Sequence, residues 1–79
     1  MKLYIGNLNE IIGDEHLKQA FSEFGIVTSA TVIKDRYTNK SRGFGFVEMP
    51  NLEEASNVIK TVNGGTWEGR IIKVKKAFK

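Results

Sequence analysis

The sequence predicts an α+β domain in which two helices cover one face of a four-stranded antiparallel sheet. Three observations predict it. Some short segments alternate between apolar and polar residues, others repeat apolar residues every three or four positions, and the two kinds occur in the order strand, helix, strand, strand, helix, strand. With 79 residues, the chain has room for one domain, which we assign to residues 1–79.

The first two elements are a strand over residues 2–7 and a helix over residues 14–24. Side chains alternate between the two faces of a strand, so Leu3 and Ile5 face one side and Tyr4 faces the other. The helix carries apolar residues at three- and four-residue spacing that we expect in the core: Leu17, Ala20, Phe21 and Phe24. A glycine directly after it supplies the stop.

Two further strands follow, joined by a polar loop. Residues 27–34 include a β-branched pair that favours a strand, and residues 35–41 are polar. Residues 43–49 form the next strand, which Pro50 ends.

The last elements are a helix over residues 51–62 and a strand over about residues 70–76. Asn51 and Glu54 have the spacing of a capping box at the start of this helix. Its residues expected to face inward are Ala55, Ile59 and Val62. The whole order suggests the split βαβ, ferredoxin-like arrangement, in which the first and third strands are central neighbours and one sheet face stays open to water.

The third strand carries aromatic residues that this topology places on the open face. Val47 is the apolar residue expected in the core, so Phe44 and Phe46 alternate onto the other side, where Tyr4 joins them. The last strand is expected to add three residues to this face: Ile71, Lys73 and Lys75. Aromatic rings stack on unpaired bases at about 1–3 kcal/mol each, and lysine or arginine neutralises phosphates. The open face is therefore suited to single-stranded nucleic acid.

Charge is segregated along the chain, which supports this interpretation. The net charge is only +3, but residues 69–79 contain five basic residues and no acidic one. A second basic group lies in and beside the loop over residues 34–42, diluted by one aspartate. A positively charged surface beside exposed rings favours an anionic partner.

Two segments resemble the ribonucleoprotein signatures of the RNA-recognition-motif family. Residues 42–49 (RGFGFVEM) resemble the longer signature, and residues 3–8 (LYIGNL) resemble the shorter one. Their order and separation match too, and the likeness covers essentially the whole chain. Met49 stands where the signature prefers an aromatic residue, at a position that usually faces away from the central bases. The chain is similar to small stand-alone bacterial RNA-binding proteins and to the RNA-recognition domains of plant glycine-rich proteins.

The resemblance implies non-catalytic binding of short single-stranded RNA, with single-stranded DNA as a further ligand. It implies that Tyr4 and Phe44 stack on successive bases, and that Phe46 lies between two sugar rings. Arg42 would pair with a phosphate, and Asn7 would either bond a base or cap the turn. The other residues implied to border or cross the bases are Thr31, Ile33, Lys73, Lys75, Lys76 and Phe78.

Some aromatic residues have two interpretations. Phe78 either caps the core or stacks on a base, Trp67 either packs in a hairpin or stacks, and Tyr37 touches either RNA or nothing. A protein-docking role for the open face is an alternative function, against which the segregated charge argues. An enzyme or metal carrier would need paired cysteines or clustered catalytic groups, and the sequence has no cysteine and a single histidine, His16. We expect no catalytic residue, metal or cofactor.

The chain start is not typical of a signal peptide, because its apolar run is short and Asn7 interrupts it. No segment approaches the roughly 18 apolar residues that a membrane helix needs. We therefore expect no membrane contact, and a location in the cytoplasm if the protein is bacterial and in the nucleus or cytoplasm otherwise. We also expect a monomer.

Overall fold

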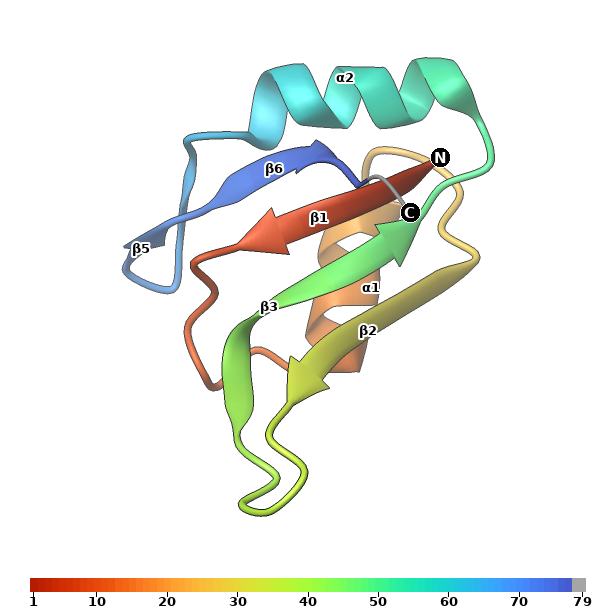
Figure 1. Ribbon diagram of the computed structural model, residues 1–79. Coiled ribbons are helices and arrows are strands. Elements are labelled where there is room, and N and C mark those ends of the chain that lie inside the picture. The colour runs from red at the N-terminus through yellow and green to blue at the C-terminus, as the bar shows by residue number, and fades with distance from the viewer. Residues whose placement is uncertain (78–79) are drawn as a thin grey trace.

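The computed structural model describes residues 1–77 and contains a four-stranded antiparallel sheet with two helices on one face (Figure 1). The elements in chain order are β1 (Lys2–Gly6), α1 (Asp14–Ser22), β2 (Ser29–Lys34), β3 (Ser41–Glu48), α2 (Leu52–Val62), β4 (Thr66–Trp67), β5 (Arg70–Ile71) and β6 (Lys73–Lys76). The sheet order β2-β3-β1-β6 puts β1 and β3 at the centre. The predicted α+β, ferredoxin-like fold is therefore confirmed.

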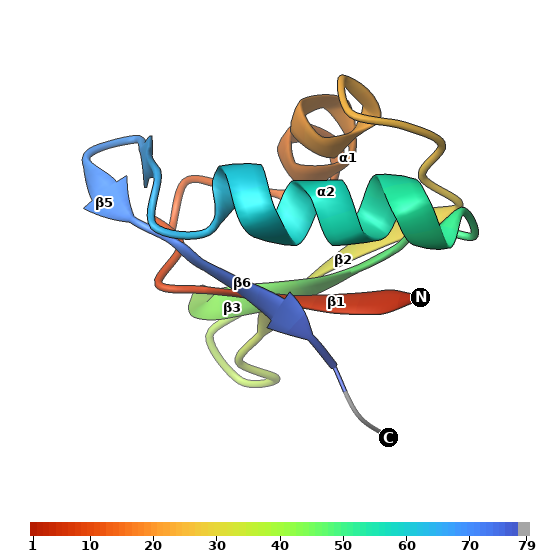
Figure 2. The ribbon, with the colours of Figure 1, turned by 90° about the horizontal axis from the view of Figure 1, so that it is seen from above.

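The core lies between the sheet and the helices, which both cover the same side (Figure 2). Alternate residues of the strands enter it, and each helix adds its apolar stripe. The largest fully buried side chains are those of Phe21, Leu3, Ile5, Leu17, Met49, Val47, Val58 and Val74. Met49, the departure from the family signature, is thus a core residue.

Three polar side chains tie the helical layer to the strands and loops. The Asp14 carboxylate accepts a hydrogen bond from the Val32 N–H of β2 at 2.7 Å. Glu54 of α2 accepts from the Ile26 N–H in the loop after α1 at 3.1 Å. Asn63, directly after α2, accepts from the Val74 N–H of β6 at 2.9 Å. These bonds satisfy backbone donors that the sheet ladder leaves unpaired.

The last strand differs from the prediction, because residues 70–76 form two short strands rather than one. β5 pairs with β4 in a separate two-stranded hairpin, and β6 pairs with β1. Ile72 lies between them: its N–H donates to the Gly65 carbonyl and its carbonyl accepts from Gly64, each at 2.9 Å. These bonds to the segment after α2 hold Ile72 out of the β1 ladder and split the strand.

The prediction that Phe24 belongs to the core is wrong, since this side chain is 41% exposed, whereas Phe21 is 2% exposed. α1 ends two residues earlier than expected, and the Phe24 N–H bonds the Phe21 carbonyl three residues back. This tighter turn takes Phe24 off the helical line on which its spacing was counted. On α2, Ala55 and Val58 are fully buried, and Ile59 and Val62 are partly buried beside them.

No helix within residues 1–77 is long and apolar enough to cross a membrane.

Candidate nucleic-acid interface

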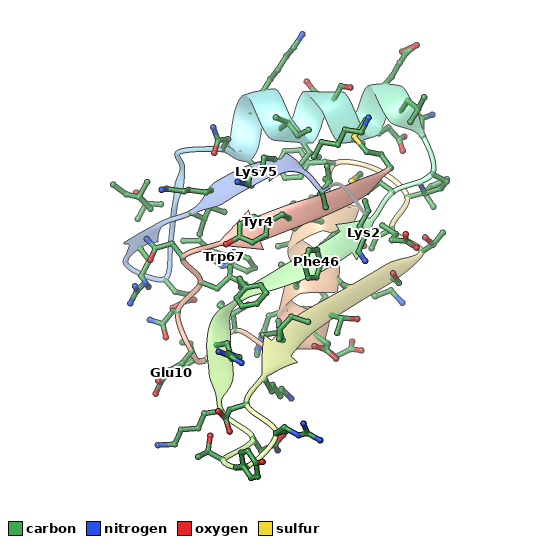
Figure 3. The ribbon with its side chains drawn as sticks, in the orientation of Figure 1. Lys2, Tyr4, Glu10, Phe46, Trp67 and Lys75 are labelled. Atoms are coloured by element: carbon green, nitrogen blue, oxygen red, sulfur yellow. The ribbon has the colours of Figure 1, made fainter. Side chains whose placement is uncertain are left out.

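Three aromatic rings gather on the sheet face opposite the helices, and we call Tyr4, Phe44 and Phe46 the aromatic platform. Tyr4 of β1 lies directly across from Phe46 of β3, and Phe44 lies across from Gly6. The ring centroids are 5.8, 6.0 and 6.1 Å apart, so each ring contacts the other two. Tyr4 and Phe46 project from the sheet on the side turned away from α1 (Figure 3). All three side chains are half-buried, which leaves part of each ring to a ligand.

The rings are not equivalent in orientation. The Tyr4 and Phe44 planes are inclined by 28°, whereas Phe46 stands at 67° and 89° to them. Two nearly parallel rings can each take the flat face of a base, and the third ring presents an edge to its neighbours.

One row of residues crosses all four strands of the sheet and includes two platform rings. Thr31 of β2 lies opposite Phe46, which lies opposite Tyr4, which lies opposite Lys75 of β6. Thr31 and Lys75 are both exposed at the ends of this row. The register thus brings together four residues that the sequence assigned separately to the binding face.

The neighbouring positions extend this face in both directions. Lys73 is exposed on β6 and lies opposite Gly6, which lies opposite Phe44 on its other side. Ile33 follows the buried Val32 on β2 and is half-buried, near an irregularity in the pairing of β2 with β3.

Two lysine ammonium groups lie over the platform rings. Lys75 Nζ is 5.3 Å from the Tyr4 ring centroid, and Lys2 Nζ is 4.7 Å from the Phe46 centroid. Such contacts are worth about 0.5–1 kcal/mol at exposed sites. Sequence reasoning missed Lys2, although it alternates with Leu3 and therefore shares the face of Tyr4. A stacked nucleotide would find a positive charge beside each of these two rings (Figure 3).

An open cavity of about 530 Å³ adjoins the platform and is lined by Tyr4 and Phe44. Three cationic side chains line it as well: Arg42, Arg70 and Lys73. Arg42 was expected to meet a phosphate, and Arg70 was missed even though it belongs to the basic C-terminal segment. The cavity joins aromatic and cationic groups, which is the combination that a nucleotide requires.

The Asn7 amide contacts both residues of β5. Its Nδ2 donates to the Ile71 carbonyl at 2.8 Å, and its Oδ1 accepts from Arg70 Nη2 at 2.7 Å and from Arg70 Nε at 3.3 Å. Asn7 also has a positive φ of 61°, a conformation that asparagine adopts more readily than most residues. The side chain therefore ties the end of β1 to β5.

The loop between β2 and β3 is ordered by Asp35. Its Oδ1 accepts from the Tyr37 and Thr38 N–H groups at 2.8 and 3.0 Å, and these bonds, with that from Thr38 the larger cause, lower the pKa of Asp35 below its usual 3.8. Tyr37 is 88% exposed, and the Arg36 guanidinium lies 5.9 Å from its ring centroid. The loop presents an exposed aromatic residue beside a cation.

The remaining candidates lie apart from the platform. Lys76 is exposed on β6, opposite the buried Leu3, and Phe78 lies outside the described residues. Trp67 packs against the core, as its hairpin interpretation predicted. His16 Nδ1 accepts the Gly13 N–H at 3.0 Å and so caps α1. Within residues 1–77, no three His, Asp or Glu side chains are grouped to hold a metal ion.

Comparisons with known proteins agree with this architecture. A family model described as the RNA recognition motif matches residues 3–73. Glycine-rich RNA-binding protein 4, mitochondrial, of Arabidopsis thaliana is 50% identical over 76 residues, covering 96% of this chain and 56% of the plant protein. The chain thus spans little more than half the length of that relative.

Two further relatives are covered over most of their length. A protein of Nostoc sp. (strain PCC 7120) named RbpE is 42% identical over 77 residues, which cover 98% of this chain and 78% of that protein. The crystal structure of RNA binding protein PG1 superposes with a TM-score of 0.96 at 43% identity, covering 100% of this chain and 95% of the other.

Proposed function

The chain belongs to the RNA recognition motif family, and we propose that it is a non-catalytic module that binds a short segment of single-stranded RNA on the aromatic platform. The observation that carries this proposal is the contact among three rings on the open sheet face, with centroids 5.8 to 6.1 Å apart. Two lysine ammonium groups beside these rings support it.

In this proposal, two successive bases stack on Tyr4 and Phe44, and Phe46 lies between the sugars. Only unpaired bases can reach the rings, so the ligand is a loop, an end or another single-stranded stretch. Stacking of two bases supplies about 2–6 kcal/mol, and phosphate contacts add to it. We expect an affinity of about micromolar, which corresponds to about 8 kcal/mol.

Residues around the rings would contact the backbone and the base edges. The proposed phosphate contacts are those of Lys2, Arg42, Lys73 and Lys75, which surround the rings or line the adjoining cavity. Thr31 and Ile33 would border the bases on β2, and the exposed Lys76 would contact the RNA from the end of β6. Phe78, outside the described residues, keeps both of its interpretations.

The ligand can vary in its chemistry only as far as the platform allows, and the protein itself is expected to be monomeric. Single-stranded DNA carries the same stacking surfaces and phosphates, so it is proposed as a second ligand. We expect the module to act as a monomer within the cell and without catalysis. The mitochondrial location in the name of the Arabidopsis relative belongs to that protein and is not part of the proposal for this chain.

The experiment that tests the function is an NMR titration of the protein with short RNA oligonucleotides of varied sequence. The wild-type protein should show the largest shifts at Tyr4, Phe44 and Phe46. The double variant Phe44→Ala, Phe46→Ala should bind at least about fivefold more weakly, because one stacking surface and the ring between the sugars are lost.

Phe24→Ala is the matched control, because it removes an exposed aromatic ring that is not part of the platform. Phe24 lines a separate cleft between the two helices and Trp67. It should leave RNA affinity unchanged. A folded double variant that binds as tightly as this control would contradict the proposal.

A further inference from the structure

The cavity beside the platform has a feature that stacking does not explain, namely an arginine held in place by the side chain of Asn7, which directly follows β1. We infer that this cavity is a phosphate subsite, in which Arg70 binds one particular phosphate of the RNA backbone and Asn7 is its positioning residue. The inference rests on the proposed function and extends the site beyond the three rings.

The contacts of Arg70 leave part of its guanidinium available to a ligand. A guanidinium has five N–H donors in a planar fork. The hydrogen bonds described within residues 1–77 use Nε and Nη2, both toward Asn7 Oδ1, at 3.3 and 2.7 Å. The fork is thus held along one edge, while the side chain as a whole is exposed and lines the cavity.

Asn7 is suited to hold this arginine because its own position is fixed twice. Its Nδ2 donates to the Ile71 carbonyl at 2.8 Å, so the amide cannot rotate without losing that bond. Its Oδ1 is therefore directed at Arg70. A donor group oriented before the ligand arrives loses less conformational entropy on binding than a freely rotating side chain.

The charge around Arg70 favours an anion. Arg42 and Lys73 line the same cavity, and none of its described lining residues is acidic. The acidic residue on this sheet face, Glu48, lies opposite Lys2 at the other end of β1 and β3. Phosphate is therefore attracted toward the cavity end of the platform rather than the Glu48 end.

The cavity is also continuous with the stacking surface. Tyr4 and Phe44 belong to the platform and line the cavity as well. A nucleotide stacked on these rings therefore has its neighbouring phosphate beside Arg70. An arginine suits this task because its fork can donate two parallel bonds to one phosphate.

A methylphosphonate scan tests the inference. The probe is the RNA hexanucleotide that binds most tightly in the titration above, prepared in versions that each carry one neutral methylphosphonate linkage. In the wild-type protein, one replaced linkage should weaken binding about five- to tenfold more than the others. In Arg70→Gln, replacing that linkage should have no extra effect, because its partner is already gone.

Two further variants separate positioning from general effects. Asn7→Gly accepts the positive φ without strain but removes the amide, so it should lose most of the extra effect at the same linkage. If Asn7 has a purely structural role, Asn7→Gly should lower the thermal unfolding midpoint, but the methylphosphonate at that linkage should still weaken binding more than the others. Lys60→Gln removes one positive charge from α2 and should keep the wild-type pattern.

The outcomes are distinct. If the hexanucleotide binds but Arg70→Gln shows the same linkage dependence as the wild-type protein, the inference is overturned and the proposed function stands. If no oligonucleotide binds the wild-type protein, both are overturned. Loss of the effect in Arg70→Gln, with Lys60→Gln unchanged, supports the subsite.

Discussion

The Tyr4 ring lies over Gly6, two residues further along the same strand: a β-carbon at position 6 would stand 2.7 Å from both Cε1 and Oη of the tyrosine. Gly6 is also the residue opposite Phe44. The absence of a side chain at this position thus lets the Tyr4 ring lie flat beside the Phe44 ring, with planes inclined by 28°. Gly6 thus shapes the aromatic platform.

Gly6→Ala should therefore weaken RNA binding while the fold survives. The new methyl group meets only the far end of a flexible side chain, so the Tyr4 ring moves away and one stacking surface is lost. We expect about a fivefold or larger loss of affinity and a free energy of unfolding within about 1 kcal/mol of the wild-type value. A fluorescence titration and chemical denaturation measure the two quantities. Tyr4→Ala is the control: if it weakens binding and Gly6→Ala does not, the ring has not been displaced.

Gly45→Ala should have the opposite profile, with a large effect on stability. A β-carbon here would lie 2.5 Å from the Thr31 carbonyl oxygen and 3.2 Å from Leu17 Cδ2, between β2 and α1. Backbone atoms cannot move aside as a tyrosine ring can, so we expect destabilisation of about 1–3 kcal/mol or more by chemical denaturation. Equal stability of the Gly45→Ala and Gly6→Ala variants would show that β2 and α1 do not pack as closely around Gly45 as described.

Replacing both Lys73 and Lys75 by glutamine should weaken binding to all RNA sequences by a similar factor. Each phosphate contact contributes about 0.7 to the slope of log affinity against log salt for a single strand, so the slope should fall by about 1.4. Titrations at several salt concentrations measure it. The control replaces Lys18 and Lys60, on the two helices, by glutamine and removes the same charge. An identical slope in both double variants would argue against phosphate contacts at β6.

The Asp35 turn should be stable to mild acid and open only below the usual titration range of an aspartate. The Thr38 and Tyr37 N–H groups lower the pKa of Asp35 in the folded protein, so its contribution is present above the unfolded-state value of 3.8 and is lost as the pH falls through the lower folded value. An NMR titration of the Asp35 carboxyl carbon, with amide exchange at Tyr37 and Thr38, measures both events. Asp35→Asn should show no such transition, and a measured pKa at or above 3.8 would refute the prediction.

Much of the fold could be predicted because side-chain alternation is a local property. Leu3, Ile5 and Val47 are buried and Tyr4, Phe44 and Phe46 face away from the helices, as a period of two requires once one residue on each strand is assigned to the core. Phe24 shows where this reasoning stops. Its spacing fits a helical stripe, but the helix ends before it, and the position of a helix end depends on tertiary contacts as well as on spacing.

Residues that meet across the chain could not be predicted in the same way. Asn7 and Arg70 are 63 positions apart, and each was assigned from its own segment alone. Arg70 lies on β5, which the break at Ile72 separates from β6, and the Ile72 N–H bonds the Gly65 carbonyl rather than β1. Neither the alternation of strand residues nor the spacing of helix residues contains information about contacts between such distant segments.

The sequence by itself determined which side chains lie on the open face, because the direction of each residue in a strand follows from covalent geometry. The tertiary structure decided which of them touch. It set the register that aligns Thr31, Phe46, Tyr4 and Lys75 in one row, and it brought Arg70 to Asn7. These relationships depend on how separate strands pair and where they are interrupted, and that is fixed only when the core between sheet and helices is packed.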